Sequence, residues 1–202
     1  MPSFTLVPHS VSARFTDPLV GPLAAAGITP NMVSLAGFAG NLAAACLAAG
    51  GHFLPAGVVM LAASGLDLLD GALARKTGSV TRFGAVFDSV LDRLSEAAVL
   101  AGVLFHYTQV GGHTQEVLLC YAAIVGSIMV SYVRARAEGL GLTLREGLFT
   151  RAERVILLGA ALIISHGVML WALWALAVLS HLTAAQRVFT VWERAREGGE
   201  GR

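Results

Sequence analysis

Four aspartates in an otherwise strongly apolar part of the chain are the residues best suited to chemistry. They are Asp67, Asp70, Asp88 and Asp92. The segments that carry them, Phe53–Arg75 and Phe83–Tyr107, are each long enough to cross a bilayer as one helix, which takes about 20 residues. An aspartate at the centre of such a helix costs roughly 2.5–3.5 kcal/mol if it faces lipid. We therefore expect the four carboxylates to face inward, toward water, a cation or one another.

Helical spacing gathers these side chains on two faces. Residues four apart lie on the same side of a helix, so Asp67 shares a stripe with Gly71 and Arg75, and Asp88 shares one with Asp92. The turn between the two segments is short, so we expect them to be antiparallel neighbours whose acidic faces meet. Gly71 has no side chain and leaves room for a ligand or a backbone to approach.

Clustered carboxylates repel one another unless cations neutralise them. Ligation by oxygen alone suits magnesium, manganese or calcium rather than zinc. Magnesium or manganese held by carboxylates usually keeps positions open for phosphate oxygens. Two such ions can clamp a pyrophosphate and stabilise the attacking and leaving oxygens. The motif therefore predicts phosphoryl-type transfer within a membrane, supported by divalent cations, Mg²⁺ or Mn²⁺, two in number.

The pattern D-x2-D-G-x2-A-R-x8-G-x3-D-x3-D resembles the signature of the CDP-alcohol phosphatidyltransferase family. The chain matches every fixed position of that signature. These positions are Asp67, Asp70, Gly71, Ala74, Arg75, Gly84, Asp88 and Asp92. The alternative is that the aspartates are caps or surface charges of short helices, and they would then match this spacing by chance with a probability on the order of 10⁻⁶.

Composition places the aspartates in a polytopic membrane protein. Of the 202 residues, 55% are hydrophobic and 13% are charged, and the mean hydropathy is +0.70. We predict an all-α integral membrane protein with six transmembrane helices and an N-terminal interfacial helix. The expected spans are about Met32–Gly50, Phe53–Arg75, Phe83–Tyr107, Val117–Ala135, Val155–Met169 and Trp171–Trp192.

The chain before the first span is mixed in character. Pro18 and Pro22 argue against a long helix, so we interpret the segment as a short interfacial helix, with a disordered leader as the alternative. We expect no cleavable signal peptide. Asn31 is predicted to cap the first span, and a role beside the nucleotide is the alternative that the family resemblance suggests. The predicted divisions are a juxtamembrane segment (1–28), a six-helix domain (29–194) and a polar tail (195–202).

The basic residues predict the orientation. All 14 lysines and arginines fall in the N-terminal segment, around the turn between the second and third spans, at the start of the third span, in the connection between the fourth and fifth, or near the C-terminus. The opposite loops, around His52, His113 and His166, carry none. Positively charged loops are cytoplasmic. We therefore expect both termini, and an active site near that face, on the cytoplasmic side of the cell membrane.

A second polar group lies toward the C-terminus. Ser131 and Arg134 stand near the end of the fourth span, Arg154 opens the fifth, and Arg187 lies within the sixth. Arginines at helix ends often only anchor a protein to anionic headgroups. If these arginines converge instead, they suit a phosphate, which guanidinium binds in bidentate fashion.

The segments around these residues are similar to the phosphatidylinositol-phosphate synthase and archaetidylinositol-phosphate synthase branch of the family. This resemblance implies that Ser131, Arg134, Arg154 and Arg187 hold an inositol phosphate. The chain departs from the branch in two places. Arg134 stands where the actinobacterial enzymes have lysine, and Ala152 stands where they have proline.

The resemblance also implies a reaction. A phosphatidyl group passes from CDP-diacylglycerol, or its ether-lipid equivalent, to the hydroxyl of inositol 1-phosphate, and CMP leaves. The four aspartates of the motif would be the metal ligands, with Asp92 also the general base. Gly71, Ala74 and Arg75 would bind the nucleotide. Glu96 either supports the site or pairs with an arginine.

Two other functions remain open at this point. Glycerol 3-phosphate is an alternative acceptor, because it too carries a phosphate. A cation transporter would also use intramembrane aspartates, although the chain has no inverted repeat. The family resemblance implies a homodimer in the lipid bilayer, and we expect no nucleic-acid partner.

Overall fold

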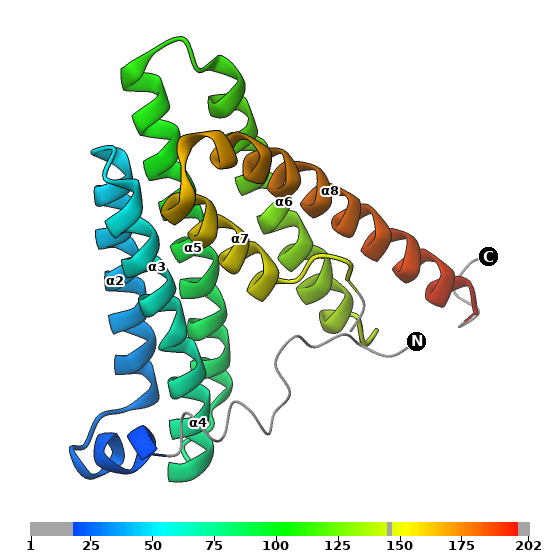
Figure 1. The fold of residues 1–202 in the computed structure, drawn as a ribbon. Helices are drawn as coiled ribbons and strands as arrows, with labels where there is room; N and C mark the ends of the chain where they lie inside the picture. The colour runs from blue at the N-terminus through cyan, green and yellow to red at the C-terminus, as the bar shows by residue number, and fades with distance from the viewer. Residues whose placement is uncertain (1–17, 145–146, 198–202) are drawn as a thin grey trace.

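The computed structural model describes residues 18–144 and 147–197 and is built from helices (Figure 1). A short helix over residues 18–25 comes first. The helices that follow are α2 (Pro30–Ala49), α3 (Phe53–Gly65), α4 (Asp67–Thr77), α5 (Arg82–Val110), α6 (Thr114–Gly139), α7 (Arg151–Ile164) and α8 (His166–Glu197). The N-terminal part of the predicted interfacial helix lies outside the described residues.

Four helical stretches in the described part of the chain are long and apolar enough to cross a membrane. They are Pro30–Ala49, Phe53–Thr77, Thr114–Gly139 and Gly167–Arg196. This is the pattern of an integral membrane protein, as predicted. Helix α5 has 29 residues but carries several charges, and α7 has only 14 residues.

The helices pack as two connected groups. Helix α2 contacts α3, α4 and α5, whereas α6 contacts α5 and α8, and α7 contacts α3 and α8. In Figure 1, α2, α3 and α5 run side by side, and α6, α7 and α8 slant away from them toward the C-terminus. The core between the groups includes Met60, Leu100, Leu158 and Leu173, which are almost completely buried.

Small residues allow the close helix crossings. A β-carbon on Gly102 of α5 would lie 2.3 Å from the carbonyl oxygen of Ala45 on α2. One on Gly57 of α3 would lie 2.8 Å from the carbonyl oxygen of Gly159 on α7. Glycine at such positions lets the backbones of membrane helices approach closely. These crossings pack α5 closely against α2 and α7 closely against α3.

The second predicted span forms one helical stretch, Phe53–Thr77, with a local irregularity at Leu66 that divides it into α3 and α4. Around Leu66 the hydrogen bonds shorten to i→i+3, from Leu66 N–H to the Ala63 carbonyl (3.1 Å) and from Leu69 N–H to the Leu66 carbonyl (2.8 Å). Helix α3 therefore ends before the motif and α4 begins at Asp67. The aspartates at 67 and 70 thus lie in the first turn of α4, where the helix dipole favours negative charge.

Two boundary predictions were wrong. Thr29, not Asn31, is the N-cap of α2, and its Oγ1 accepts a hydrogen bond from Met32 N–H (3.3 Å). The cap moves because Pro30 occupies the first helical position, where its missing N–H has no cost. The fifth span ends at Ile164 rather than Met169, since Ser165 has extended backbone and starts the turn into α8.

Candidate active site

A short, well-capped turn joins the two motif helices. Helix α4 ends at Gly78, whose φ of 65° is a left-handed conformation that favours glycine. Helix α5 then starts with Thr81 as its N-cap, and the Thr81 hydroxyl accepts a hydrogen bond from Gly84 N–H at 2.9 Å. Both ends of the turn are thus defined by local hydrogen bonding, which brings the two acidic segments to the same end of the bundle.

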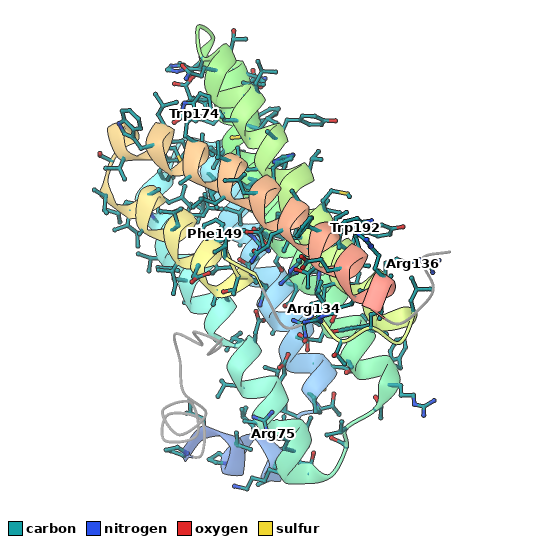
Figure 2. The ribbon with its side chains drawn as sticks, turned by 90° about the vertical axis from the view of Figure 1, so that its right-hand side faces the viewer. Arg75, Arg134, Arg136, Phe149, Trp174 and Trp192 are labelled. Atoms are coloured by element: carbon teal, nitrogen blue, oxygen red, sulfur yellow. The ribbon has the colours of Figure 1, made fainter. Side chains whose placement is uncertain are left out.

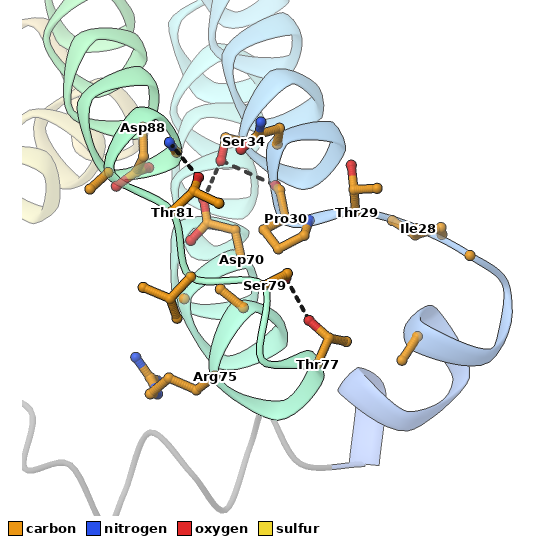
Figure 3. A pocket seen from close by; sticks show the side chains of 18 residues that line it. Ile28, Thr29, Pro30, Ser34, Asp70, Arg75, Thr77, Ser79, Thr81 and Asp88 are labelled. Carbon is orange, nitrogen blue, oxygen red and sulfur yellow. Dashed lines mark hydrogen bonds between the residues drawn. The ribbon is translucent and has the colours of Figure 1, made fainter.

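A cavity of about 720 Å³ opens at this end, between the starts of α2 and α5 and the body of α4 (Figure 3). Several predicted site residues line it. These are Asn31, Asp70, Gly71, Ala74, Arg75 and Asp88. Asn31 therefore lines this cavity although it is not the cap, and its role beside the nucleotide stays a prediction.

Ser34 is a site residue that the sequence did not single out. It is buried on α2, and its hydroxyl donates a hydrogen bond to Asp70 Oδ2 at 2.6 Å (Figure 3). Asp70 itself is only 6% exposed. A serine in an apolar helix carries no signal of its own. Only the packing of α2 against α4 reveals that it orients the carboxylate of Asp70.

The other two aspartates meet through an arginine. Arg151 Nη2 lies 2.7 Å from Asp67 Oδ2 and 2.9 Å from Asp92 Oδ1. The acidic faces of α4 and α5 therefore do meet, as predicted. Arg151 was not among the predicted site residues. A usable signal existed, because Arg151 lies three residues before Arg154 and so shares a face of α7 with it.

The acidic motif has the donor chemistry of a divalent-cation site. The four aspartates supply only oxygen, which suits Mg²⁺ or Mn²⁺. Within the described residues, however, no group of three or more His, Cys, Asp or Glu side chains is close enough to hold a metal ion. Positive charge between two of the carboxylates comes from Arg151 instead. The residues therefore fit a divalent cation in their chemistry, although in this arrangement their carboxylates are spread apart.

Arg154 and Glu96 form a buried ion pair. Arg154 Nε lies 2.7 Å from Glu96 Oε1, and Nη2 lies 3.0 Å from Oε2, with side-chain exposures of 2% and 3%. Glu96 thus pairs with an arginine, one of the two roles considered for it. The bidentate contact fixes the plane of the guanidinium group. The Nη1 atom of Arg154 faces the carbonyl oxygen of Phe149 at 3.4 Å.

The arginines predicted to hold a phosphate are close to one another. The guanidinium group of Arg187 is within electrostatic reach of Arg134, Arg154 and Arg93, and Arg93 is within reach of Arg134 and Arg154. Figure 2 shows Arg134 between Arg75 of the cavity and Trp174 at the opposite end of the molecule. Glu96 and Glu138 offset part of the repulsion among these cations, and a phosphate bound among them would offset more of it.

The individual settings of these residues differ. Arg187 is 6% exposed and donates to the Val130 carbonyl at 2.7 Å. Arg134 is exposed and pairs with Glu138 at 2.9 Å, within the same helix. The Ser131 hydroxyl donates to the carbonyl of Ser127 at 3.3 Å. The buried arginine is therefore held in place, whereas Arg134 has an exposed, weak partner that it can exchange.

Helix α8 also holds the connection between α6 and α7. The side chain of Gln186 accepts a hydrogen bond from Leu148 N–H at 3.2 Å, and Arg194 donates to the carbonyl of Thr143. Gly147 lies against the Arg187 guanidinium, where a β-carbon would come within 2.8 Å of Nη2. Gln186 and Arg187 of α8 thus position residues 147 and 148, which lead into Arg151.

Apolar helices long enough to cross a membrane accompany a cavity lined by Asp70, Asp88 and Arg75, side chains suited to an enzyme that acts on phosphate groups at a membrane. The family model for CDP-alcohol phosphatidyltransferase matches residues 27–185. The chain belongs to the CDP-alcohol phosphatidyltransferase family and is an enzyme of this type.

Relatives within the family are similar over nearly their whole length. The phosphatidylinositol phosphate synthase of Mycobacteroides abscessus is 39% identical, over 92% of this chain and 87% of the relative. The archaetidylinositol phosphate synthase of Methanothermobacter thermautotrophicus is 38% identical, over 92% of this chain and 93% of the relative.

Solved structures agree with this assignment. The crystal structure of Mycobacterium tuberculosis phosphatidylinositol phosphate synthase with CDP-DAG bound has a TM-score of 0.81 and 34% identity, covering 89% of this chain and 94% of that one. The same enzyme in complex with manganese and citrate has a TM-score of 0.79 and 34% identity, covering 88% of each chain.

Proposed function

We propose that this enzyme transfers a phosphatidyl group from CDP-diacylglycerol, or its ether-lipid equivalent, to the hydroxyl of inositol 1-phosphate and releases CMP. The observation that carries the choice of a phosphate-bearing acceptor is the proximity of Arg187 to Arg134 and Arg154. The names of the relatives favour inositol phosphate among such acceptors. A lipid-soluble donor and a phosphate-bearing acceptor would thus meet at the aspartates.

The donor would bind in the cavity between α2, α4 and α5. Asn31, Gly71, Ala74 and Arg75 line this cavity and would contact the nucleotide and its phosphates. Gly71 and Ala74 present little side chain, so a ring or a phosphate can approach the α4 backbone closely. The relative with CDP-DAG bound supports this assignment.

The four aspartates of the motif would hold the divalent cations, Mg²⁺ or Mn²⁺, and we propose two of them. A relative in complex with manganese supports a metal in this family. When bound, such ions neutralise charge on the pyrophosphate and on the leaving CMP. The protein's own contribution is to orient the ligands, as Ser34 does for Asp70.

Asp92 would act as the general base. Its carboxylate accepts the proton of the acceptor hydroxyl, and the hydroxyl oxygen attacks the phosphorus that bears the diacylglycerol. The bond from that phosphorus to the oxygen shared with CMP breaks, and CMP leaves with the electron pair. General-base catalysis requires hydrogen-bond reach and typically contributes about 10²–10⁴-fold to the rate.

The acceptor phosphate would lie among Ser131, Arg134, Arg154 and Arg187. A phosphate offers several acceptor oxygens to guanidinium groups that approach from different helices. Arg154 is presented at a fixed angle by Glu96, and Arg187 is held by α6. Arg134 would exchange its exposed partner for the phosphate.

The test is CMP release by the purified protein with CDP-diacylglycerol and magnesium. Parallel reactions contain inositol 1-phosphate, glycerol 3-phosphate, free inositol or serine. We expect turnover with inositol 1-phosphate only. Turnover with glycerol 3-phosphate instead would keep the family chemistry and contradict the acceptor, whereas no CMP with any acceptor would contradict the proposed reaction.

The Ser34→Ala variant is expected to lose about tenfold in kcat/KM for CDP-diacylglycerol. A hydrogen bond to a charged group contributes roughly 1.5–3 kcal/mol, and its loss leaves Asp70 without its partner on α2. CMP release at limiting CDP-diacylglycerol measures the effect. The matched control is Ser180→Ala, a buried serine of α8 whose Oγ makes no hydrogen bond in the described structure. Equal rates for the two variants would contradict an orienting role for Ser34.

The membrane arrangement proposed with this function has six spans, with α5 and α7 completing the four apolar stretches. Helix α5 is about 44 Å long at 1.5 Å per residue, which exceeds the roughly 30 Å of hydrocarbon. Two of its acids, Asp92 and Glu96, pair with arginines of α7 rather than facing lipid. In this proposal the domain covers residues 29–194, and both termini and the active site face the cytoplasm across the cell membrane. The chain would work as a homodimer.

A further inference from the structure

Arg151 ties together helices that are far apart in the sequence. It is the first residue of α7, and its Nη2 atom contacts Asp67 of α4 at 2.7 Å and Asp92 of α5 at 2.9 Å. The three side chains are 30%, 18% and 15% exposed. One guanidinium group therefore neutralises two carboxylates, which would otherwise repel each other across the junction of α4 and α5.

This contact is incompletely satisfied. The Nε atom of Arg151 is buried and has no hydrogen-bond partner within the described residues. A buried donor without a partner costs about 1–3 kcal/mol. Arg154, one turn further along α7, differs in this respect, because its Nε and Nη2 are both bonded to Glu96. Arg154 thus has the contacts of a permanent structural pair, whereas Arg151 has those of a side chain that gains by moving.

We propose that Arg151 is an internal counter-ion that holds the acidic site together when it is empty and is displaced when a divalent cation binds. The inference rests on the metal role given to the aspartates under the proposed function. Asp67 Oδ2 and Asp92 Oδ1 already accept hydrogen bonds from Arg151 Nη2, so they are not free to bind a cation. A divalent cation next to the guanidinium group would also be repelled by its positive charge. Cation binding between Asp67 and Asp92 therefore requires Arg151 to withdraw, and the cost of withdrawal lowers the affinity of the site for the cation.

The Arg151→Gln variant is expected to bind Mn²⁺ about tenfold more tightly than the wild type, which corresponds to about 1.4 kcal/mol. Glutamine keeps polar character but removes the competing charge. Free Mn²⁺ is measured by electron paramagnetic resonance during titration of the full-length protein in detergent. The matched control is Arg136→Gln, since Arg136 is exposed on α6 and is not part of the site. It should leave the affinity unchanged.

A second variant guards against misfolding of the first. Arg151→Lys keeps the charge on a shorter side chain that cannot span both carboxylates, so its Mn²⁺ affinity should lie between those of the wild type and the glutamine variant. Unchanged or weaker Mn²⁺ binding in these variants would overturn the inference. A wild type that binds no Mn²⁺ would overturn both the inference and the proposed metal site. Tighter binding in a protein that releases no CMP would support the inference and contradict only the proposed reaction.

Discussion

The Asp92→Asn variant is expected to release CMP about 10²–10⁴-fold more slowly than the wild type. The amide cannot take the proton of the acceptor hydroxyl at neutral pH. The effect should appear in kcat at saturating CDP-diacylglycerol and inositol 1-phosphate, because the loss falls on the chemical step. The side chain keeps its size, so the fold around α5 should survive.

The matched control is Glu116→Gln. Glu116 is a partly buried acid on α6 that pairs with His113, and both residues lie outside the cavity lining. This variant should retain the wild-type rate. Mn²⁺ titration of Asp92→Asn separates the two roles of Asp92, since weaker binding would make it a ligand as well as the base. A variant that kept more than about a third of the wild-type rate would rule Asp92 out as the base.

The Glu96→Gln variant is expected to lower the free energy of unfolding by about 3–5 kcal/mol. The substitution leaves the Arg154 guanidinium buried without an opposite charge, and breaking such a pair from one side is strongly destabilising. Thermal or denaturant-induced unfolding of the purified protein in detergent measures the change.

A surface pair of the same chemistry is the natural comparison. Glu138 pairs with Arg134 within α6, and both side chains are about half exposed. The Glu138→Gln variant should cost only about 0.3–0.5 kcal/mol. The double variant Glu96→Leu with Arg154→Met should recover most of the lost stability, because both charges are gone. It should still fail to turn over inositol 1-phosphate. Similar losses for Glu96→Gln and Glu138→Gln would show that the buried pair is not structural.

The acidic motif was predictable because its geometry is local. Spacings of three and four residues place side chains on one helix face whatever the rest of the chain does, so the meeting of Asp67 and Asp92 followed from the short turn alone. Six of the 18 residues that line the cavity were predicted site residues, and the family resemblance, rather than helix spacing, pointed to Gly71, Ala74 and Arg75 as nucleotide contacts.

Features that depend on tertiary packing were not predictable in this way. Ser34 reaches Asp70 across 36 residues, and Arg151 reaches Asp67 across 84. The Ser34 contact leaves no periodic trace in the sequence, whereas the helical spacing of Arg151 from Arg154 indicates a shared face but not its acidic partners. The irregularity at Leu66 was not predicted for another reason. The residues around it are as apolar as those of a regular helix, so composition does not mark it. The sequence left two roles open for Glu96, support of the site or pairing with an arginine. The position of α7, which places Arg154 beside Glu96, shows that it pairs with an arginine.

The ion pairs of α7 have a consequence for how the chain is made. Asp67 and Glu96 precede their arginine partners by 84 and 58 residues. At a synthesis rate of about 5–20 residues per second, roughly 3–17 s separate the acids of α4 and α5 from the arginines that neutralise them. During that interval the acidic helices have no cationic partner from α7. They must stay beside water or within the insertion machinery until α7 emerges, so the last third of the chain determines when the first half can settle into lipid.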